Sequence, residues 1–549
     1  MNDPQNLFPN GQLTRSETTI GVANKGEFLI AGFNDGDGFL RRPFRVPGQT
    51  GFQTGKPPGL SGFSFSTDGG TTWTDGDTPS IAGAVDPNFP SCGGIVTRGD
   101  PWLDSSNREE EDSTLFYANL AVHEFDGDPA FPQCSFGGNT AGVSVHSGAF
   151  FKTSGGTFRF AWNDVHLLQA VPGVGQSVGF PLDSYDKEAL AANKDVVAVS
   201  VTNFIGRSPD TIGCGFGQIE LWVSTDGGNE FGAAPLLVQP DQVSATSCDS
   251  GRLNSGSQPV IVDGDKVVVV WQNGPDFVNG IISLPLNVKI LSSTCDIEER
   301  TCSTPAVVDS INSMRRSAPQ GYNRNRMNDF PRIATSDDGR IFVVYTTGTG
   351  TPVATSVFAD SNVLLKVSDD EGKTFKGPFN VNPVDDGRKD FWPVVTVDSD
   401  GNPVVVYVSS NEANLTTDPN DIECVPGAKQ LGGGVAQNGK RSSLVDVFAA
   451  RSPDEGRTFS SPVKVTDVTS NWCKARTNVR PTFGDYIDAK SFEDRIFTVW
   501  GDGRCGATQV ACPPAGAGVA DTLPPPAGPR DRESDVFYAT AKVNPEPSD

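Results

Sequence analysis

The octet STDGGTTW at residues 66–73 decides the fold, because close copies of it return along the chain. The copies are STDGGNEF at 224–231, SDDEGKTF at 368–375 and SPDEGRTF at 452–459. An Asp in a tight turn accepts hydrogen bonds from backbone N–H groups two residues on, a Gly tolerates a positive φ, and a final Trp or Phe packs between sheets. These requirements are structural, so we expect each octet to be a peripheral turn and not an active site.

Outward from each octet, the sequence repeats a unit of four predicted strands. A strand such as QIELWVS leads into the octet, and a short strand such as SPVKV follows it. Before them comes a hairpin with a turn rich in Asp, Asn and Gly, which recurs near residues 18, 101, 188, 258, 331, 393 and 483. One such sheet cannot bury both faces alone, so the repeat predicts an all-β fold, a β-propeller of four-stranded antiparallel blades. Seven blades are favoured, six are the alternative, and residues 1–549 are expected to form one domain.

The two ends of the chain predict how the ring closes. The last unit, RESDVFYATAKVNPEPSD at 532–549, has a third strand but no octet and no fourth strand. The segment NLFPNGQLTR at 6–15 precedes the first hairpin, where a fourth strand belongs. We therefore expect the N-terminal strand to complete the last blade and remove an exposed sheet edge.

Charge and hydropathy limit the partners. The formal net charge is −24, and such a surface repels the phosphate backbone, so nucleic acid is not expected as a partner. No apolar run approaches the roughly 20 residues of a membrane-spanning helix, so no membrane span is expected. The oligomeric state is left open.

Ten cysteines without a CxxC pair favour disulfides over zinc, with ten buried free thiols as the alternative. Disulfides predict a secreted or otherwise extracytoplasmic protein. Pairing between sequence neighbours is the simplest arrangement: Cys92 with Cys134, Cys214 with Cys248, Cys295 with Cys302, Cys424 with Cys473, and Cys505 with Cys512.

The octet pattern S-x-D-x-G-x-x-[FW] resembles the Asp-box, or bacterial neuraminidase (BNR) repeat, of the sialidase superfamily. The resemblance implies a β-propeller whose boxes lie on the periphery, away from the substrate pocket. It covers residues 66–459 directly. The chain departs from the pattern at FKTSGGTFRF, residues 151–160, which is a decayed copy, and at residues 280–302, which have none. The resemblance also implies a propeller of six blades, whereas the sequence contains seven predicted hairpins.

Candidate site residues come from the segments that precede the first strand of each hairpin, because these segments meet at one face of a propeller. The charged residues expected to ring this face are Arg15, Glu17, Arg98, Asp100, Asp186, Lys187, Asp329, Arg332, Asp390, Arg480 and Asp485. A sialidase-type mechanism needs arginines that hold a substrate carboxylate, a Tyr nucleophile beside a carboxylate, and an acid/base carboxyl group. By resemblance these are Arg15, Arg332 and Arg480; Tyr486 beside Glu17 or Asp485; and Asp100. The alternative is that these charges pair with one another around a wet channel.

Two functions from different classes follow. The first is an extracellular sialidase-like glycoside hydrolase that acts on terminal acidic sugars of a carbohydrate or glycoprotein. The second is a non-catalytic propeller that binds glycan or protein. No cofactor is expected. The acidic turns at 34–39 and 125–129 offer oxygen atoms to calcium but do not complete an EF-hand pattern, and three scattered histidines do not suggest a metal site.

Overall fold

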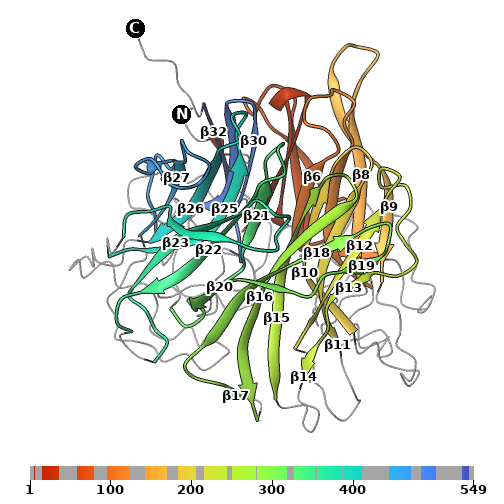
Figure 1. Cartoon of the computed structure of the whole chain (residues 1–549). Helices are drawn as coiled ribbons and strands as arrows, with labels where there is room; N and C mark the ends of the chain where they lie inside the picture. The colour runs from red at the N-terminus through yellow and green to blue at the C-terminus, as the bar shows by residue number, and fades with distance from the viewer. Residues whose placement is uncertain are drawn as a thin grey trace, which may run out of the picture.

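The computed structural model describes residues 5–6, 15–35, 59–79, 95–123, 142–169, 183–205, 216–243, 250–279, 281–317, 327–352, 355–384, 387–410, 444–471, 484–502 and 535–542. Within these ranges the protein is all-β, and its single helical segment is the short 3-10 turn η1 (Asn24–Gly26). The sheets follow one another in chain order, and the red N-terminal strands lie near the blue C-terminal ones (Figure 1). This arrangement is a β-propeller.

The first three sheets are antiparallel and four-stranded, with strands in chain order. The first contains β2 (Arg15–Ala23), β3 (Phe28–Asp35), β4 (Ser61–Ser66) and β5 (Thr74–Asp77). The second contains β6 (Ile95–Ser105), β7 (Leu115–His123), β8 (Gly142–Lys152) and β9 (Phe158–Leu168). The third contains β10 (Asp183–Ala192), β11 (Val197–Ile205), β12 (Gln218–Ser224) and β13 (Leu236–Gln239).

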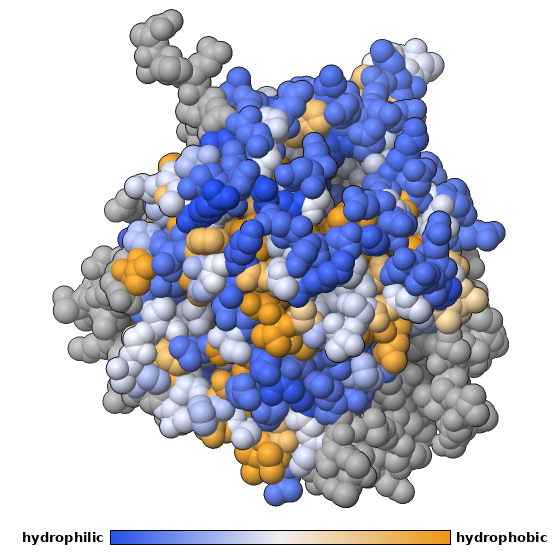
Figure 2. Space-filling view, viewed as in Figure 1, coloured by the Kyte–Doolittle hydropathy of each residue, from blue (hydrophilic) through white to orange (hydrophobic). Residues whose placement is uncertain are grey.

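The fourth sheet carries extra short strands. It contains β14 (Gln242–Val243), β15 (Gly251–Val262), β16 (Lys266–Val278), β17 (Ile281–Ile282), β18 (Asn287–Asp296), β19 (Thr301–Cys302) and β20 (Ala306–Asn312). The end of the molecule where Figure 1 shows β17 carries an apolar area in Figure 2, and Ile281 in that strand is 71% exposed.

The nine-stranded sheet consists of two antiparallel units joined by one parallel bridge between Ser361 and Lys389. The first unit contains β21 (Arg332–Thr335), β22 (Ile341–Thr349), β23 (Asp360–Ser368) and β24 (Lys376–Asn380). The second contains β25 (Lys389–Val397), β26 (Pro403–Ser410), β27 (Leu444–Arg451), β28 (Val463–Lys464) and β29 (Ser470–Asn471).

The last sheet confirms the expected closure by the N-terminal strand. It contains β30 (Asp488–Phe492), β31 (Arg495–Asp502) and β32 (Asp535–Lys542), and its fourth strand is β1 (Gln5–Asn6), which pairs antiparallel with β32. The first strands of neighbouring units also contact one another, and β30 contacts β2, so the first strands form a closed ring. We interpret this grouping as seven blades, and both that number and the single domain stay predictions.

The core lies between neighbouring sheets. Valines 268 and 270 of β16, for example, are fully buried and pack in one apolar cluster with Ile341 and Val343 of β22. A strand covered on both faces needs apolar residues on both, so the second strands read as nearly continuous β-branched runs.

Each octet forms a turn between the third and fourth strands of its unit. In the first copy, the Ser66 hydroxyl donates to Asp68 (2.8 Å) and accepts from the Gly70 N–H group (2.9 Å). The Asp68 carboxylate accepts from the N–H group of Thr72 (2.8 Å), four residues further on, which is a longer reach than the two residues expected from Asx turns. Gly70 has a φ of +86°, and a Cβ there would lie 2.2 Å from the ring of Tyr538 in the neighbouring sheet.

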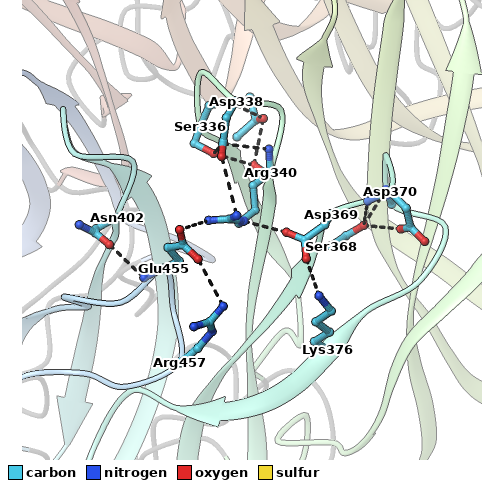
Figure 3. A network of polar contacts seen from close by, with 12 residues as sticks. Ser336, Asp338, Arg340, Ser368, Asp369, Asp370, Lys376, Asn402, Glu455 and Arg457 are labelled. Carbon is cyan, nitrogen blue, oxygen red and sulfur yellow. Dashed lines mark hydrogen bonds and ion pairs between the residues drawn. The ribbon is translucent and has the colours of Figure 1, made fainter.

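Ion pairs connect successive octet turns. Arg340, in the hairpin turn between β21 and β22, contacts Asp369 (2.7 Å) in one octet and Glu455 (3.0 Å) in the next (Figure 3). Asp369 also pairs with Lys376 (2.6 Å). Arg340 therefore joins the octet turns of two neighbouring units, as expected of a structural contact.

One predicted disulfide is confirmed. Cys295 and Cys302 are bonded and join β18 to β19, in the unit that lacks an octet. The other eight cysteines lie outside the described residues, so their pairing stays a prediction: Cys92, Cys134, Cys214, Cys248, Cys424, Cys473, Cys505 and Cys512.

Candidate functional site

The first strands of five units are interrupted at the same place. Two residues drop out of the ladder in β2, β6, β10, β15 and β25. The first residue of each consecutive pair has a positive φ: Glu17 (51°), Asp100 (54°), Lys187 (55°), Gly256 (65°) or Trp392 (48°). Shortly before this pair, β6 and β15 each skip one further residue, Arg98 and Leu253. A left-handed non-glycine residue costs about 1–3 kcal/mol, and such strain concentrates at functional sites. The repeated bulge brings residues from distant parts of the sequence to one place.

A lysine lies among three carboxylates from these segments. The Lys187 ammonium is 2.5 Å from Asp100 Oδ2, 2.7 Å from Asp485 Oδ2 and 3.8 Å from Glu17 Oε1. Burial lowers the pKa of Lys187, but the carboxylates outweigh burial and hold that pKa well above its ordinary value. Lys187 is therefore a permanent cation, and it fixes Asp100 and Asp485 as its acceptors.

Asn34 orients the other side of this cluster. Its side-chain amide donates to Glu17 Oε2 (2.5 Å), and its carbonyl oxygen accepts from the Asp100 N–H group (2.8 Å). Burial and the nearby Asp100 charge raise the pKa of Glu17 well above its usual range. Glu17 and Asp100 therefore form a closely coupled pair of carboxyl groups.

Arg332 packs between an ion-pair partner and two aromatic rings. Its guanidinium is 2.8 Å from Asp488 and lies 4.2 Å from the centre of the Trp102 ring and 5.9 Å from that of Tyr486. The Tyr486 hydroxyl donates to the Pro101 carbonyl oxygen (2.9 Å). Burial, followed by the charges of nearby carboxylates, raises the pKa of Tyr486 well above 10.0, so the phenol is held neutral.

A central cavity of about 30 Å³ lies where these segments converge. The bulges of β10, β15 and β25, together with the segments before β21 and β30, contribute to its wall, which includes Lys187, Arg332, Asp485, Tyr486 and Trp102. This volume holds about two water molecules. Charged and aromatic side chains thus surround a small, partly enclosed space.

Several buried polar atoms of the cavity wall lack a hydrogen-bond partner among the described residues. They are Trp102 Nε1, Ser257 Oγ, Asn328 Nδ2, Arg332 Nε and both carboxyl oxygens of Glu188. An unsatisfied buried polar group costs about 1–3 kcal/mol, and native proteins rarely leave many together. Donors and acceptors gathered around one cavity are therefore available to a ligand or to water.

The structure brings together about half of the charged residues expected at this face. Glu17, Asp100 and Asp485 meet at Lys187, and Arg332 and Tyr486 line the cavity. Arg15 has a different partner: it lies 3.8 Å from Asp35 and over the Phe33 ring. Arg480 lies outside the described residues. The catalytic and substrate-binding roles of these residues stay predictions.

Pairing within the expected set of charges is seen at Lys187, which faces Asp100 and Asp485. Arg332 and Arg15 face carboxylates outside that set, Asp488 and Asp35. Sequence reasoning missed Glu188, because a glutamate beside Lys187 gives no sign of being buried without a donor. It also missed Trp102 and Asn328. Their only signal is position, since both lie close to a first strand.

Two further observations concern metals and membranes. Across the described ranges, no group of three or more His, Cys, Asp or Glu side chains is arranged to hold a metal ion. No helix in this part of the chain is long and apolar enough to cross a membrane.

No protein family model matches the sequence, and no curated protein matches it either. Among solved structures, the chain is similar to an α-L-arabinofuranosidase of Fusarium graminearum in complex with arabinobiose, with 11% identity, a TM-score of 0.37, and 74% of this chain and 92% of that chain covered. An ulvan lyase gives 10% identity, a TM-score of 0.42, and 97% and 95% coverage. The endosialidase of phage phi92 gives 11% identity, a TM-score of 0.41, and 98% and 70% coverage. Similarity at this level assigns no activity to this chain.

Proposed function

We propose that the protein is a glycan-processing enzyme, a glycoside hydrolase, with its site at the central cavity. The observation that carries this proposal is the group of unpartnered polar atoms, carboxyl groups and aromatic rings on one cavity wall. Glycoside hydrolysis needs two carboxyl groups near the bond that breaks, one as a proton donor and one as a base or nucleophile. Glu188 and Asp485 both line the cavity.

The groups of the cavity wall also suit the polarity of a sugar. A sugar presents many hydroxyl groups, which need donors and acceptors, and apolar C–H faces, which pack on aromatic rings. Trp102 and Tyr486 lie 5.5 Å apart between ring centres and supply such a surface, while Ser257 and Asn328 supply unpartnered polar groups. This combination favours a carbohydrate over a purely apolar ligand.

The resemblance to sialidases suggests a terminal acidic sugar, and Lys187 and Arg332 are the cations that would meet its carboxylate at the cavity. Both already pair with carboxylates, at 2.5 Å and 2.8 Å. The local charges therefore favour recognition through sugar hydroxyls, and an acidic sugar is the second substrate class to test. We also propose an extracytoplasmic location, which the Cys295–Cys302 disulfide supports.

A substrate panel tests the proposal. The full chain is incubated with fluorogenic neutral hexosides, pentosides and sialosides and with polysaccharides, and released fluorophore and reducing ends are measured. We expect turnover of at least one class, lost in Asn328→Leu, which fills the cavity, and retained in Asn229→Leu, an exposed octet residue. Absence of turnover on every glycan, or equal activity in both variants, contradicts the proposal.

A non-catalytic glycan-binding propeller is the second candidate. The pairing of Lys187 with Asp100 and Asp485 favours it, because an ion-paired carboxylate is a weaker base. Saturable binding on a glycan array, lost in Asn328→Leu and without any hydrolysis, supports this second function over the first.

A further inference from the structure

Two buried glutamates of the third sheet have opposite surroundings. Glu220 accepts hydrogen bonds from the Tyr185 hydroxyl (2.7 Å), from the Asn203 amide (2.9 Å) and from Gln218. Glu188 is equally buried, with 3% exposure, but neither of its carboxyl oxygens has a hydrogen-bond partner among the described residues. A buried carboxylate without donors is strongly disfavoured, so Glu188 is held in its neutral acid form.

The position of Glu188 gives this neutral acid a use. It is the second unpaired residue of the β10 bulge, directly after Lys187, and it lines the central cavity with Asp485. Burial, followed by the charge of Asp100, raises the pKa of Glu188 well above its ordinary value. The backbone N–H group of Glu188 itself and the charge of Lys187 oppose the rise, and Asp186 adds to it. The protonated form of the side chain is therefore favoured beside the space where a ligand would bind.

We propose that Glu188 is the proton donor of this site, an inference that rests on the proposed hydrolase function. When the glycosidic C–O bond breaks, its electron pair goes to the leaving oxygen, which takes the proton from Glu188. Water adds to the anomeric carbon, and the proton it loses passes to the surrounding water. Proton exchange with solvent then restores neutral Glu188.

This assignment differs from the expectation that Asp100 is the acid. Asp100 Oδ2 lies 2.5 Å from the Lys187 ammonium, which donates to it. An oxygen that accepts a hydrogen bond from a cation is a poor proton donor. Glu188 has no such donor among the described residues, and this difference selects it.

Leaving-group dependence tests the proton donor directly. A 2,4-dinitrophenyl glycoside departs without protonation, whereas an alkyl glycoside of the same sugar requires it. Glu188→Gln should lose about 10²–10⁴-fold in kcat/KM on the alkyl glycoside and less than about tenfold on the dinitrophenyl glycoside. Glu220→Gln is the matched buried control and should change both substrates by the same factor. Circular dichroism and melting temperature verify that each variant is folded.

The outcomes separate the two proposals. If the wild type hydrolyses glycosides but Glu188→Gln affects both substrates equally, or affects neither, the proton-donor assignment fails and the hydrolase function stands. If Asp100→Asn shows the leaving-group dependence instead, Asp100 is the acid and the assignment also fails. If the wild type hydrolyses neither glycoside and none of the panel glycans, both proposals fail together.

Discussion

Replacing Asp370 by Ala should loosen its octet turn without affecting ligand binding at the central cavity. The Asp370 carboxylate accepts hydrogen bonds from the Thr374 N–H group (2.8 Å), the Thr374 hydroxyl (2.6 Å) and the Ser368 hydroxyl (2.8 Å). Thr374 is exposed, so water replaces two of these bonds at little cost. Ser368 is fully buried, so its hydroxyl loses an acceptor that water does not easily replace.

The expected loss is about 1–2 kcal/mol in the free energy of local opening. This is the low end of the energy range for losing one buried and two exposed hydrogen bonds. The octet around Asp226 provides an internal comparison. Asp226 accepts from Ser224 (2.7 Å) and from the Glu230 N–H group (3.0 Å), but Glu occupies the place of the Thr hydroxyl. Asp226→Ala should therefore cost about 0.5–1 kcal/mol less than Asp370→Ala.

Hydrogen exchange with mass spectrometry measures this local effect. The reporter is the buried N–H group of Gly372, which donates to Ser368 Oγ (2.9 Å). It should exchange about 5–30 times faster in Asp370→Ala. Lys373→Ala, in the same turn but with an exposed side chain, is the control and should exchange like the wild type. Unchanged exchange in Asp370→Ala, or loss of glycan binding without loss of protection, would refute the reasoning.

Arg340→Met should lower the free energy of unfolding by only about 1 kcal/mol, because its partners Asp369 and Glu455 are more than a third exposed. The loss should shrink in 1 M salt, which screens ion pairs. A loss in urea unfolding that does not change with salt would contradict an ionic role. Burial lowers the pKa of His146 from 6.5 to about 3, so its neutral form stabilises the fold above pH 6.5 and this contribution is lost as pH falls toward 3. In His146→Phe, the free energy of unfolding should fall less steeply with decreasing pH, by up to about 1.4 kcal/mol per pH unit. Parallel curves of unfolding free energy against pH for the two proteins would disprove this prediction. Deleting residues 1–13 removes the strand paired with β32, which should lower the melting temperature and cause association; a monomeric protein with unchanged melting would count against closure.

The site was only partly predictable, for a physical reason. Charge-rich segments before the first strands were recognisable because every propeller directs such segments to one face. Sequence also placed Arg332 and Tyr486 near that face, and both line the cavity. It could not show that Asp100 serves as an acceptor for Lys187, because that depends on a 2.5 Å contact between residues 87 positions apart.

The sequence by itself determined the repeating sheets, the octet turns and the closure by the N-terminal strand. These features depend on strand alternation, on hydrogen bonds reaching four residues at most within a turn, and on a missing fourth strand, all of which are local patterns. Only the tertiary structure decided which carboxyl groups receive hydrogen-bond donors. Glu188 on β10 and Glu220 on β12 are glutamates of one sheet, separated by the strand β11, and three donors reach Glu220 and not Glu188. The position of such donors depends on how whole sheets pack, and the spacing of residues in the sequence does not reveal that packing.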